Sequence, residues 1–162
     1  MPAITSACQN RAAPGSTGNF NRCPYEGVVG DLRDGFIDAP QATARRQEIA
    51  DFEDQLRADG RILLKVYLQV SPQEQFKRLR KRIRNPHKHW KLSAADLSAH
   101  RQFEPLQAQW GHVLSASHRT NAPWFVLPAD HKWLRDLLLA NLLARQFAVL
   151  QQHGQRHICT ST

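Results

Sequence analysis

Cysteine is scarce in this sequence of 162 residues, which contains only Cys8, Cys23 and Cys159. An odd number of cysteines at such wide spacing excludes a disulfide framework of the kind that stabilises small secreted domains. This cysteine usage is instead typical of a protein from a reducing compartment.

Long apolar runs are also missing. No segment approaches the roughly 20 apolar residues that a helix needs to cross a bilayer, and the first residues lack the charged start and apolar core of a signal peptide. We therefore expect no membrane partner and a cytoplasmic location. There is no internal repeat, so the length favours one domain with a hydrophobic core.

A phosphate-binding loop of the G-x-x-x-x-G-K-[ST] type does not occur anywhere in the sequence. The residues GSTG at Gly15–Gly18 resemble such a loop only in their glycines, since no lysine follows to contact a phosphate. Residues 1–19 are polar and rich in turn-forming residues, and we interpret them as loop or disorder.

Carboxylates are absent from Lys77–Lys91, KRLRKRIRNPHKHWK. This stretch holds eight of the 22 basic residues, as many as the formal net charge of +8. Arg78 and Arg82 lie four residues apart on one helix face with Lys81 beside them, so a bound anion would relieve their repulsion. Because guanidinium groups bind phosphate oxygens in pairs, we expect a ligand with several phosphates. A solvated helix face and a nucleic-acid patch are the other two interpretations.

The flanking residues delimit a helix around these charges. Ser71 can cap the first backbone N–H groups, Pro72 suits the first helical position, and Glu74 completes a predicted capping box. Because Pro86 disfavours helical backbone at the residue before it, the helix is predicted to end near Arg84.

Two apolar segments are predicted to form strands. RILLKVYLQV at Arg61–Val70 is nearly continuous in apolar residues, which is typical of a strand buried on both faces of a parallel sheet. The second, PWFVL, covers Pro123–Leu127. Val28 and Val29 could begin a further short strand, although the neighbouring glycines are unfavourable there.

Helical periodicity predicts three more helices, at about Gln41–Asp59, Ser93–Ser117 and His131–Gln151. Gly60 is expected to end the first, Ser93 and Asp96 to cap the second, and Pro105 to kink or divide it. Strands that alternate with helices predict an α/β fold with a parallel sheet. Ligands bind at the carboxyl ends of such strands, where Ser71 and Pro128–Lys132 follow.

Four segments carry a family resemblance: EIADFEDQL at Glu48–Leu56, ILLKVYLQVSPQEQ, RLRKRIRNPHKHWKLSAAD, and APWFVLPADHKW at Ala122–Trp133. Two arginines four apart, followed by P-x-K-x-W-K, are the most specific part. Together, from about Gly18 to Leu143, they resemble the polyphosphate kinase 2 family of phosphotransferases.

This resemblance implies a three-layer, P-loop-kinase-like α/β fold with a parallel sheet, flanking helices and a basic helical lid. The implied activity moves a phosphoryl group between inorganic polyphosphate and a nucleoside di- or monophosphate. The implied nucleotide pair is ADP/ATP or GDP/GTP, and the implied cofactor is magnesium.

The resemblance also implies site residues near the start of the chain. FNRCPYE at Phe20–Glu26 stands where the family has F-[DN]-R-S-x-Y, a motif for magnesium and phosphate. Asn21 and Arg22 are therefore expected beside the transferred phosphoryl group. Alternatively, Arg22 only pairs with a carboxylate such as Glu26.

The basic stretch supplies the other implied site residues. Arg78 and Arg82 match lid arginines that close over phosphates, and Lys88 and Lys91 match the basic residues at the tip of the lid. Trp90 is either an apolar wedge that holds the lid against the body or a core residue. The candidate catalytic residues are then Arg22, Arg78 and Arg82.

The sequence also departs from the family pattern. The family's first strand and glycine-rich loop, with the lysine and aspartate used in phosphoryl transfer, have no counterpart here. Cys23-Pro24 stands where the family has Ser followed by His or Trp, and Gly30–Arg33 stands where it has an apolar strand. Pro105 and Trp110 stand where it has polar residues. The sequence thus resembles the C-terminal two-thirds of such an enzyme, and we expect weak or no activity from it alone.

Other hypotheses stay open. The chain could be a non-catalytic module that binds polyphosphate or RNA, or a remnant that folds poorly because a sheet edge is exposed. His87 and His89 lack further metal ligands nearby, so we assign no metal-binding residue. A homo-oligomer is left open. The expected organisation is a loop at 1–19, a partial domain at 20–153 with its lid at about 72–104, and a frayed tail at 154–162.

Overall fold

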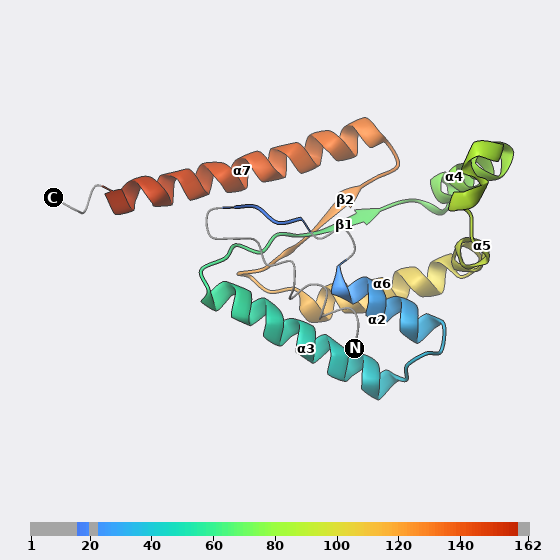
Figure 1. The fold of residues 1–162 in the computed structure, drawn as a ribbon, viewed down its shortest axis with the longest axis horizontal. Helices are drawn as coiled ribbons and strands as arrows, with labels where there is room; N and C mark the ends of the chain where they lie inside the picture. Colours follow the sequence, from blue (N-terminus) through green and yellow to red (C-terminus); the bar gives the residue numbers. More distant parts are fainter. Residues whose placement is uncertain (1–15, 20–22, 159–162) are drawn as a thin grey trace. The chain divides into compact units, whose positions relative to one another are not determined.

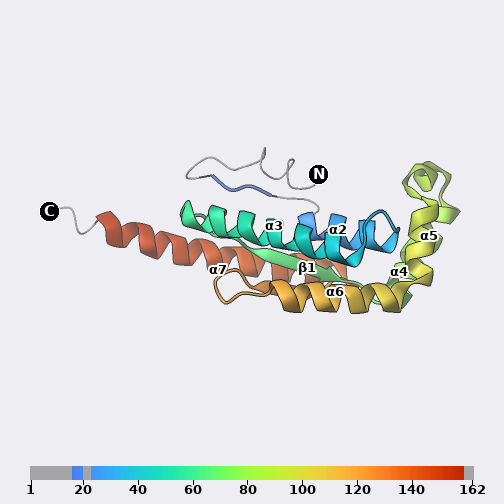
Figure 2. The same ribbon diagram turned by 90° about the horizontal axis from the view of Figure 1, so that it is seen from below.

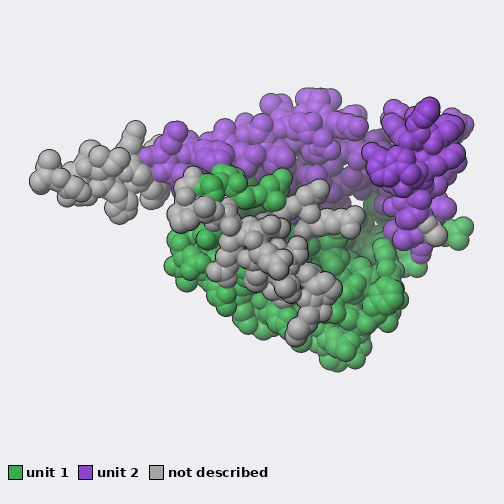
Figure 3. Space-filling model, viewed as in Figure 1, with its two compact units in different colours: residues 1–64, 101–123 green, residues 65–100, 124–162 purple. Residues whose placement is uncertain are grey.

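The computed structural model describes residues 16–19 and 23–158. The chain divides into two compact units, which Figure 3 colours separately. Unit 1 comprises residues 1–64 and 101–123, and unit 2 comprises residues 65–100 and 124–162. No helix among the described residues combines the length and the apolar character that crossing a membrane would require.

Unit 1 is helical in its described part. Helix α2 (Pro24–Arg33) packs against α3 (Ala39–Ala58) and α6 (Phe103–Ser117), as Figures 1 and 2 show. The prediction of a short strand at Val28 and Val29 is wrong, because both valines lie buried in α2. With Tyr25 they have the i, i+3, i+4 spacing of one helix face. Burial of that face outweighs the low helix propensity of the glycines beside it.

Helix α3 confirms the helix predicted at about Gln41–Asp59 and begins two residues earlier. Asp38 and Gln41 form a capping box, in which Asp38 Oδ1 accepts the Gln41 N–H at 2.8 Å and Gln41 Oε1 accepts the Asp38 N–H at 3.0 Å. Gly60 ends the helix with φ of 76°. The Arg61 N–H then donates to the Leu56 carbonyl at 3.0 Å, the bond that closes a Schellman turn.

Unit 2 contains the sheet. Strand β1 (Lys65–Gln69) pairs in parallel with β2 (Trp124–Pro128), with Lys65 opposite Trp124 and Gln69 opposite Pro128. The buried Lys65 side chain places its Nζ 5.3 Å from the ring centroid of Trp124, a cross-strand cation–π contact. The predicted parallel sheet is confirmed.

The expected burial of the first strand on both faces is wrong. Leu68 and Gln69 are exposed, and β1 is shorter than the predicted Arg61–Val70. The physical reason is that the sheet of the described residues has two strands, so β1 has a neighbouring strand on one edge only and its side chains are less covered than those of a central strand. Helix α7 (Lys132–Ile158) packs against β2 and continues beyond the predicted end near Gln151.

The lid of unit 2 consists of α4 (Pro72–Arg84), the 3-10 helix η1 (Pro86–Lys91) and α5 (Ala94–Arg101). Helix α4 ends where the sequence predicted. The long helix after Ser93 is divided between Arg101 and Phe103, ahead of Pro105. Pro105 instead occupies the first turn of α6, where a missing backbone N–H removes no helical hydrogen bond.

Candidate functional site

The carboxyl ends of β1 and β2 are joined by two hydrogen bonds. The Ala129 N–H donates to the Gln69 carbonyl at 2.7 Å, and the Ser71 N–H donates to Asp130 Oδ1 at 2.8 Å. The bond from Ser71, with Arg78 and His131 nearby, holds the pKa of Asp130 below its usual value. Ligands of parallel sheets bind at this edge.

Helix α4 begins at this edge, and its predicted capping box is only half present. Ser71 Oγ accepts the Glu74 N–H at 3.2 Å as predicted. The reciprocal bond is missing, since the Ser71 N–H donates to Asp130 instead. Glu74 pairs with Arg78 at 2.9 Å and Lys77 at 3.4 Å. These cations, Arg78 above all, lower the pKa of Glu74.

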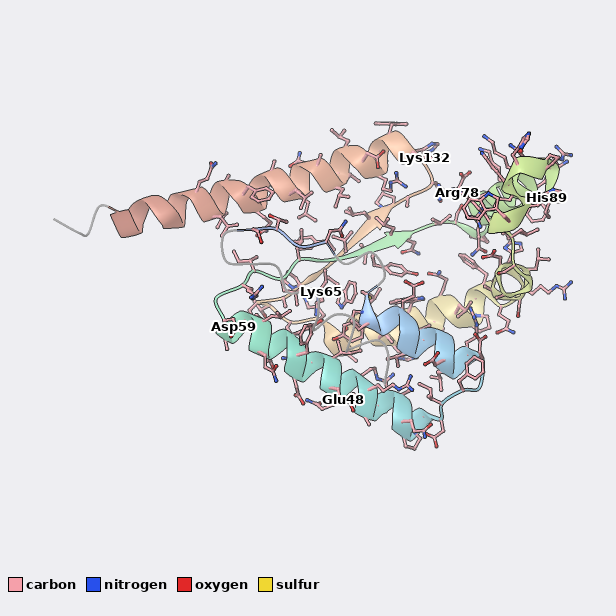
Figure 4. The ribbon with its side chains drawn as sticks, viewed as in Figure 1. Glu48, Asp59, Lys65, Arg78, His89 and Lys132 are labelled. Atoms are coloured by element: carbon pink, nitrogen blue, oxygen red, sulfur yellow. The ribbon has the colours of Figure 1, made fainter. Side chains whose placement is uncertain are left out.

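Arg78 connects α4 to the strand ends. Its Nε donates to Glu74, and its Nη2 donates to the Ala129 carbonyl at 2.6 Å and the Asp130 carbonyl at 3.2 Å. The side chain is half-buried, and Figure 4 labels it beside α4. Its Nη1 group carries two further N–H donors. Arg78 therefore points toward the predicted ligand edge and fixes α4 there.

Arg82 lies one turn further along the same helix face. Its Nη1 is 3.8 Å from Asp96 Oδ2, a loose ion pair. Asp96 is also held by a capping box, because its carboxylate accepts the Ser93 N–H at 3.0 Å and its own N–H donates to Ser93 Oγ at 3.2 Å. This confirms the predicted cap of α5. Arg82 is thus less constrained than Arg78.

The lid tip is the 3-10 helix η1. Lys88 and Lys91 are exposed there, and Lys91 Nζ lies 4.7 Å from the ring centroid of Trp90. Trp90 is 79% exposed, so its interpretation as a core residue is wrong. Asn85, ahead of Pro86, separates η1 from α4, and none of the residues of η1 is buried.

A second basic face of α4 was missed in the sequence. It consists of Lys77, Arg80, Lys81 and Arg84, all exposed, which we call the open face. Of these, only Lys77 has a carboxylate partner among the residues that the structure describes. The i, i+3, i+4 and i+7 spacing of these four was visible in the sequence and could have identified the face. Helix α4 thus has one basic face tied to protein and another open to solvent.

The remaining candidates, Asn21 and Arg22, lie outside the described residues. Close after them in unit 1, Tyr25 is buried, with only 2% of its surface exposed, and Glu53 of α3 is buried as well. Burial, and next the charge of Glu53, raises the pKa of Tyr25 well above its usual value. Burial also raises the pKa of the Cys23 thiol.

The parallel strands, the alternating helices and the basic lid at the strand ends define an α/β protein with a cationic lid. A family model, Polyphosphate kinase 2 (PPK2), matches residues 7–155. The chain therefore belongs to the polyphosphate kinase 2 family.

Named relatives agree with this assignment. The chain is 32% identical over 124 residues to an AMP/ADP-polyphosphate phosphotransferase of Meiothermus ruber, covering 76% of this chain and 46% of that protein. It is 34% identical over 113 residues to an ADP-polyphosphate phosphotransferase of Pseudomonas aeruginosa, covering 70% and 36%.

The crystal structure of polyphosphate kinase 2 from Arthrobacter aurescens superimposes with a TM-score of 0.85 at 32% identity, covering 93% of this chain and 53% of that one. The chain thus spans about half the length of this structure and of the Meiothermus relative.

Proposed function

We propose that the protein takes part in phosphoryl transfer between inorganic polyphosphate and a nucleoside di- or monophosphate, with ADP/ATP or GDP/GTP as the nucleotide pair. The observation that supports this most is the Arg78 bond to the Ala129 carbonyl at 2.6 Å. It fixes the most basic helix of the chain at the edge of the sheet where ligands bind. The family relatives named for polyphosphate supply the substrate class.

The proposed roles follow from charge and position. Phosphoryl transfer depends mainly on aligned phosphates and positive charge at the transition state. Arg82, loosely paired, and the Nη1 group of Arg78 would supply that charge. Lys88 and Lys91 would bind the polyphosphate chain at the lid tip. Asn21 and Arg22 complete the proposed phosphate-binding set.

Magnesium belongs to the proposal through the family resemblance. The residues that the structure describes do not fit a magnesium site. Within residues 16–19 and 23–158, no group of three or more His, Cys, Asp or Glu side chains could hold a metal ion. The carboxylate at the strand ends, Asp130, already accepts the Ser71 N–H. When bound, magnesium would neutralise phosphate charge. No role above depends on it.

The 162 residues alone are proposed to be weakly active, because they contain no G-x-x-x-x-G-K-[ST] loop. The test supplies polyphosphate, ADP and magnesium and measures ATP. Only trace turnover is expected, and it should vanish in Arg78→Ala and Arg82→Ala. Arg145→Ala, which removes one exposed charge from α7, is the matched control. Robust ATP formation by the wild type that is lost in Arg78→Ala and Arg82→Ala but not in Arg145→Ala would overturn the proposed weak activity and support the proposed phosphoryl transfer.

A second candidate is a non-catalytic module that binds polyanions. The open face of α4 favours it, because three of its four cations have no carboxylate partner among the described residues. Binding of polyphosphate should weaken steeply as salt rises, as counterion release predicts for nucleic acid. Affinity that is independent of salt would exclude both candidate functions, since each relies on these cations.

We propose a cytoplasmic location for either function. A homo-oligomer also remains a proposal, without a defined interface.

A further inference from the structure

The lid tip presents an aromatic ring among cations. Trp90 is 79% exposed, and His87, Lys88, His89 and Lys91 around it in η1 are exposed as well. Lys91 Nζ lies 4.7 Å from the Trp90 ring centroid. The large apolar side chain of Trp90 is therefore exposed to solvent within the most cationic stretch of the chain.

Hydrogen bonds fix this presentation. Asn85 Oδ1 accepts the His87 N–H at 3.1 Å, and a ring nitrogen of His89, Nε2, lies 2.7 Å from the Ile83 carbonyl of α4. The Leu92 N–H donates to the His89 carbonyl at 2.9 Å. The tip is thus tied back to α4 through His89 and closed at Leu92, while the Trp90 side chain between them stays exposed.

Inorganic polyphosphate gives no reason for an exposed indole, because a phosphate chain has neither an apolar surface nor a π face. A nucleobase has both, and stacking of a base on an aromatic side chain contributes about 1–3 kcal/mol per base. Exposed aromatics beside cations that follow a backbone are the usual features of single-strand binding sites.

We propose that η1 is a base-stacking site for single-stranded nucleic acid, with Trp90 stacking a base and the open face of α4 binding the phosphates. From Lys77 to Arg84 the open face extends about 10 Å along the helix axis, which suits successive phosphates of a strand better than one nucleotide. The inference rests on the lid's binding of phosphates in the proposed function, and adds a ligand class and a residue to it.

The test compares two polyanions of matched charge on the full chain: a single-stranded oligouridylate and inorganic polyphosphate. Affinities are measured by titration at one fixed salt concentration for the wild type, Trp90→Ala, Trp90→Phe and Trp133→Ala. Trp133, in α7 of the same unit, is 68% exposed and is the matched control.

Trp90→Ala should weaken oligouridylate binding roughly 5- to 100-fold, and leave polyphosphate affinity within about twofold, since its phosphates contact cations only. Trp90→Phe should keep most of the oligouridylate affinity that Trp90→Ala loses. Trp133→Ala should change the affinity for neither polyanion. Equal losses for both ligands would overturn the inference and indicate that Trp90 only supports the lid.

Two further arms separate the alternatives. Uridine monophosphate that competes as well as the oligouridylate would overturn the commitment to a strand and identify a free nucleotide as ligand. Binding of RNA without polyphosphate would support the stacking site while overturning the proposed function. Failure of the wild type to bind either polyanion would overturn both.

Discussion

The guanidinium of Arg78 donates from Nη2 to the backbone carbonyl of Ala129 at 2.6 Å, joining two residues that are 51 positions apart in the chain. A side chain expected to contact substrate therefore also attaches the lid helix to the sheet. Catalytic and structural effects of its substitution must be separated.

Arg78→Lys retains the charge but cannot form the same paired hydrogen bonds. We expect both Arg78→Lys and Arg78→Ala to lower the free energy of unfolding by about 1–3 kcal/mol, the usual contribution of charged hydrogen bonds. Urea denaturation measures this. Arg80→Ala, on the open face, is the matched control and should stay within about 0.5 kcal/mol of the wild type. A lysine variant as stable as the wild type would contradict the attachment.

Asp130 should make the stability of unit 2 sensitive to acid. Its folded pKa lies below the usual value because it accepts the Ser71 N–H. The stabilisation is therefore complete above about pH 3.9 and is lost as pH falls through the lower folded value. Asp130→Ala should be less stable than the wild type at neutral pH.

That difference should shrink as the solution is acidified, to the part that the hydrogen bond of the neutral carboxyl group contributes. Urea midpoints measured across this range provide the check. Asp130→Asn keeps an acceptor without a charge, so it separates the titrating group from the hydrogen bond alone. A difference between Asp130→Ala and the wild type that is the same at neutral and acid pH would refute the assignment.

Tyr25 should affect stability in alkali. Burial raises its folded pKa, so above about pH 10 the phenol ionises in the unfolded chain while the folded one stays neutral. The stabilisation is present below pH 10 and is lost as pH rises. Tyr25→Phe removes the titrating hydroxyl and should therefore lose less stability in alkali than the wild type.

Thermal unfolding followed by circular dichroism at increasing pH measures this loss. The chain has only one other tyrosine, Tyr67, and Tyr67→Phe is the natural comparison. Parallel curves for the wild type and Tyr25→Phe in alkali would count against a neutral, buried phenol.

The cap of α5 is a local feature that can be removed alone. Ser93 Oγ accepts the Asp96 N–H at 3.2 Å, and loss of such a cap costs about 1 kcal/mol. Ser93→Ala should therefore speed amide hydrogen exchange in α5 several-fold and leave α3 unchanged. Ser93→Asp should restore protection, since aspartate is an equally good cap. Unchanged exchange in α5 would show that packing, and not the cap, holds this helix.

Local signals made the helix limits predictable. The end of α4 before Pro86, the cap at Ser93 and the termination of α3 at Gly60 each depend on residues within one helical turn. Local signals failed at Val28 and Val29, where the glycines suggested poor structure but packing against other helices of unit 1 selected a helix.

The clustering of positive charge and the two ends of the lid helix could be read from the amino-acid sequence, because both depend on neighbouring residues. The role of each charge depends on contacts between distant parts of the chain. Arg78 and Ser71 are held by residues more than 50 positions away, while Arg80, Lys81, Arg84 and Trp90 are left to solvent. No local pattern can reveal this, since a partner's position depends on how the strands align.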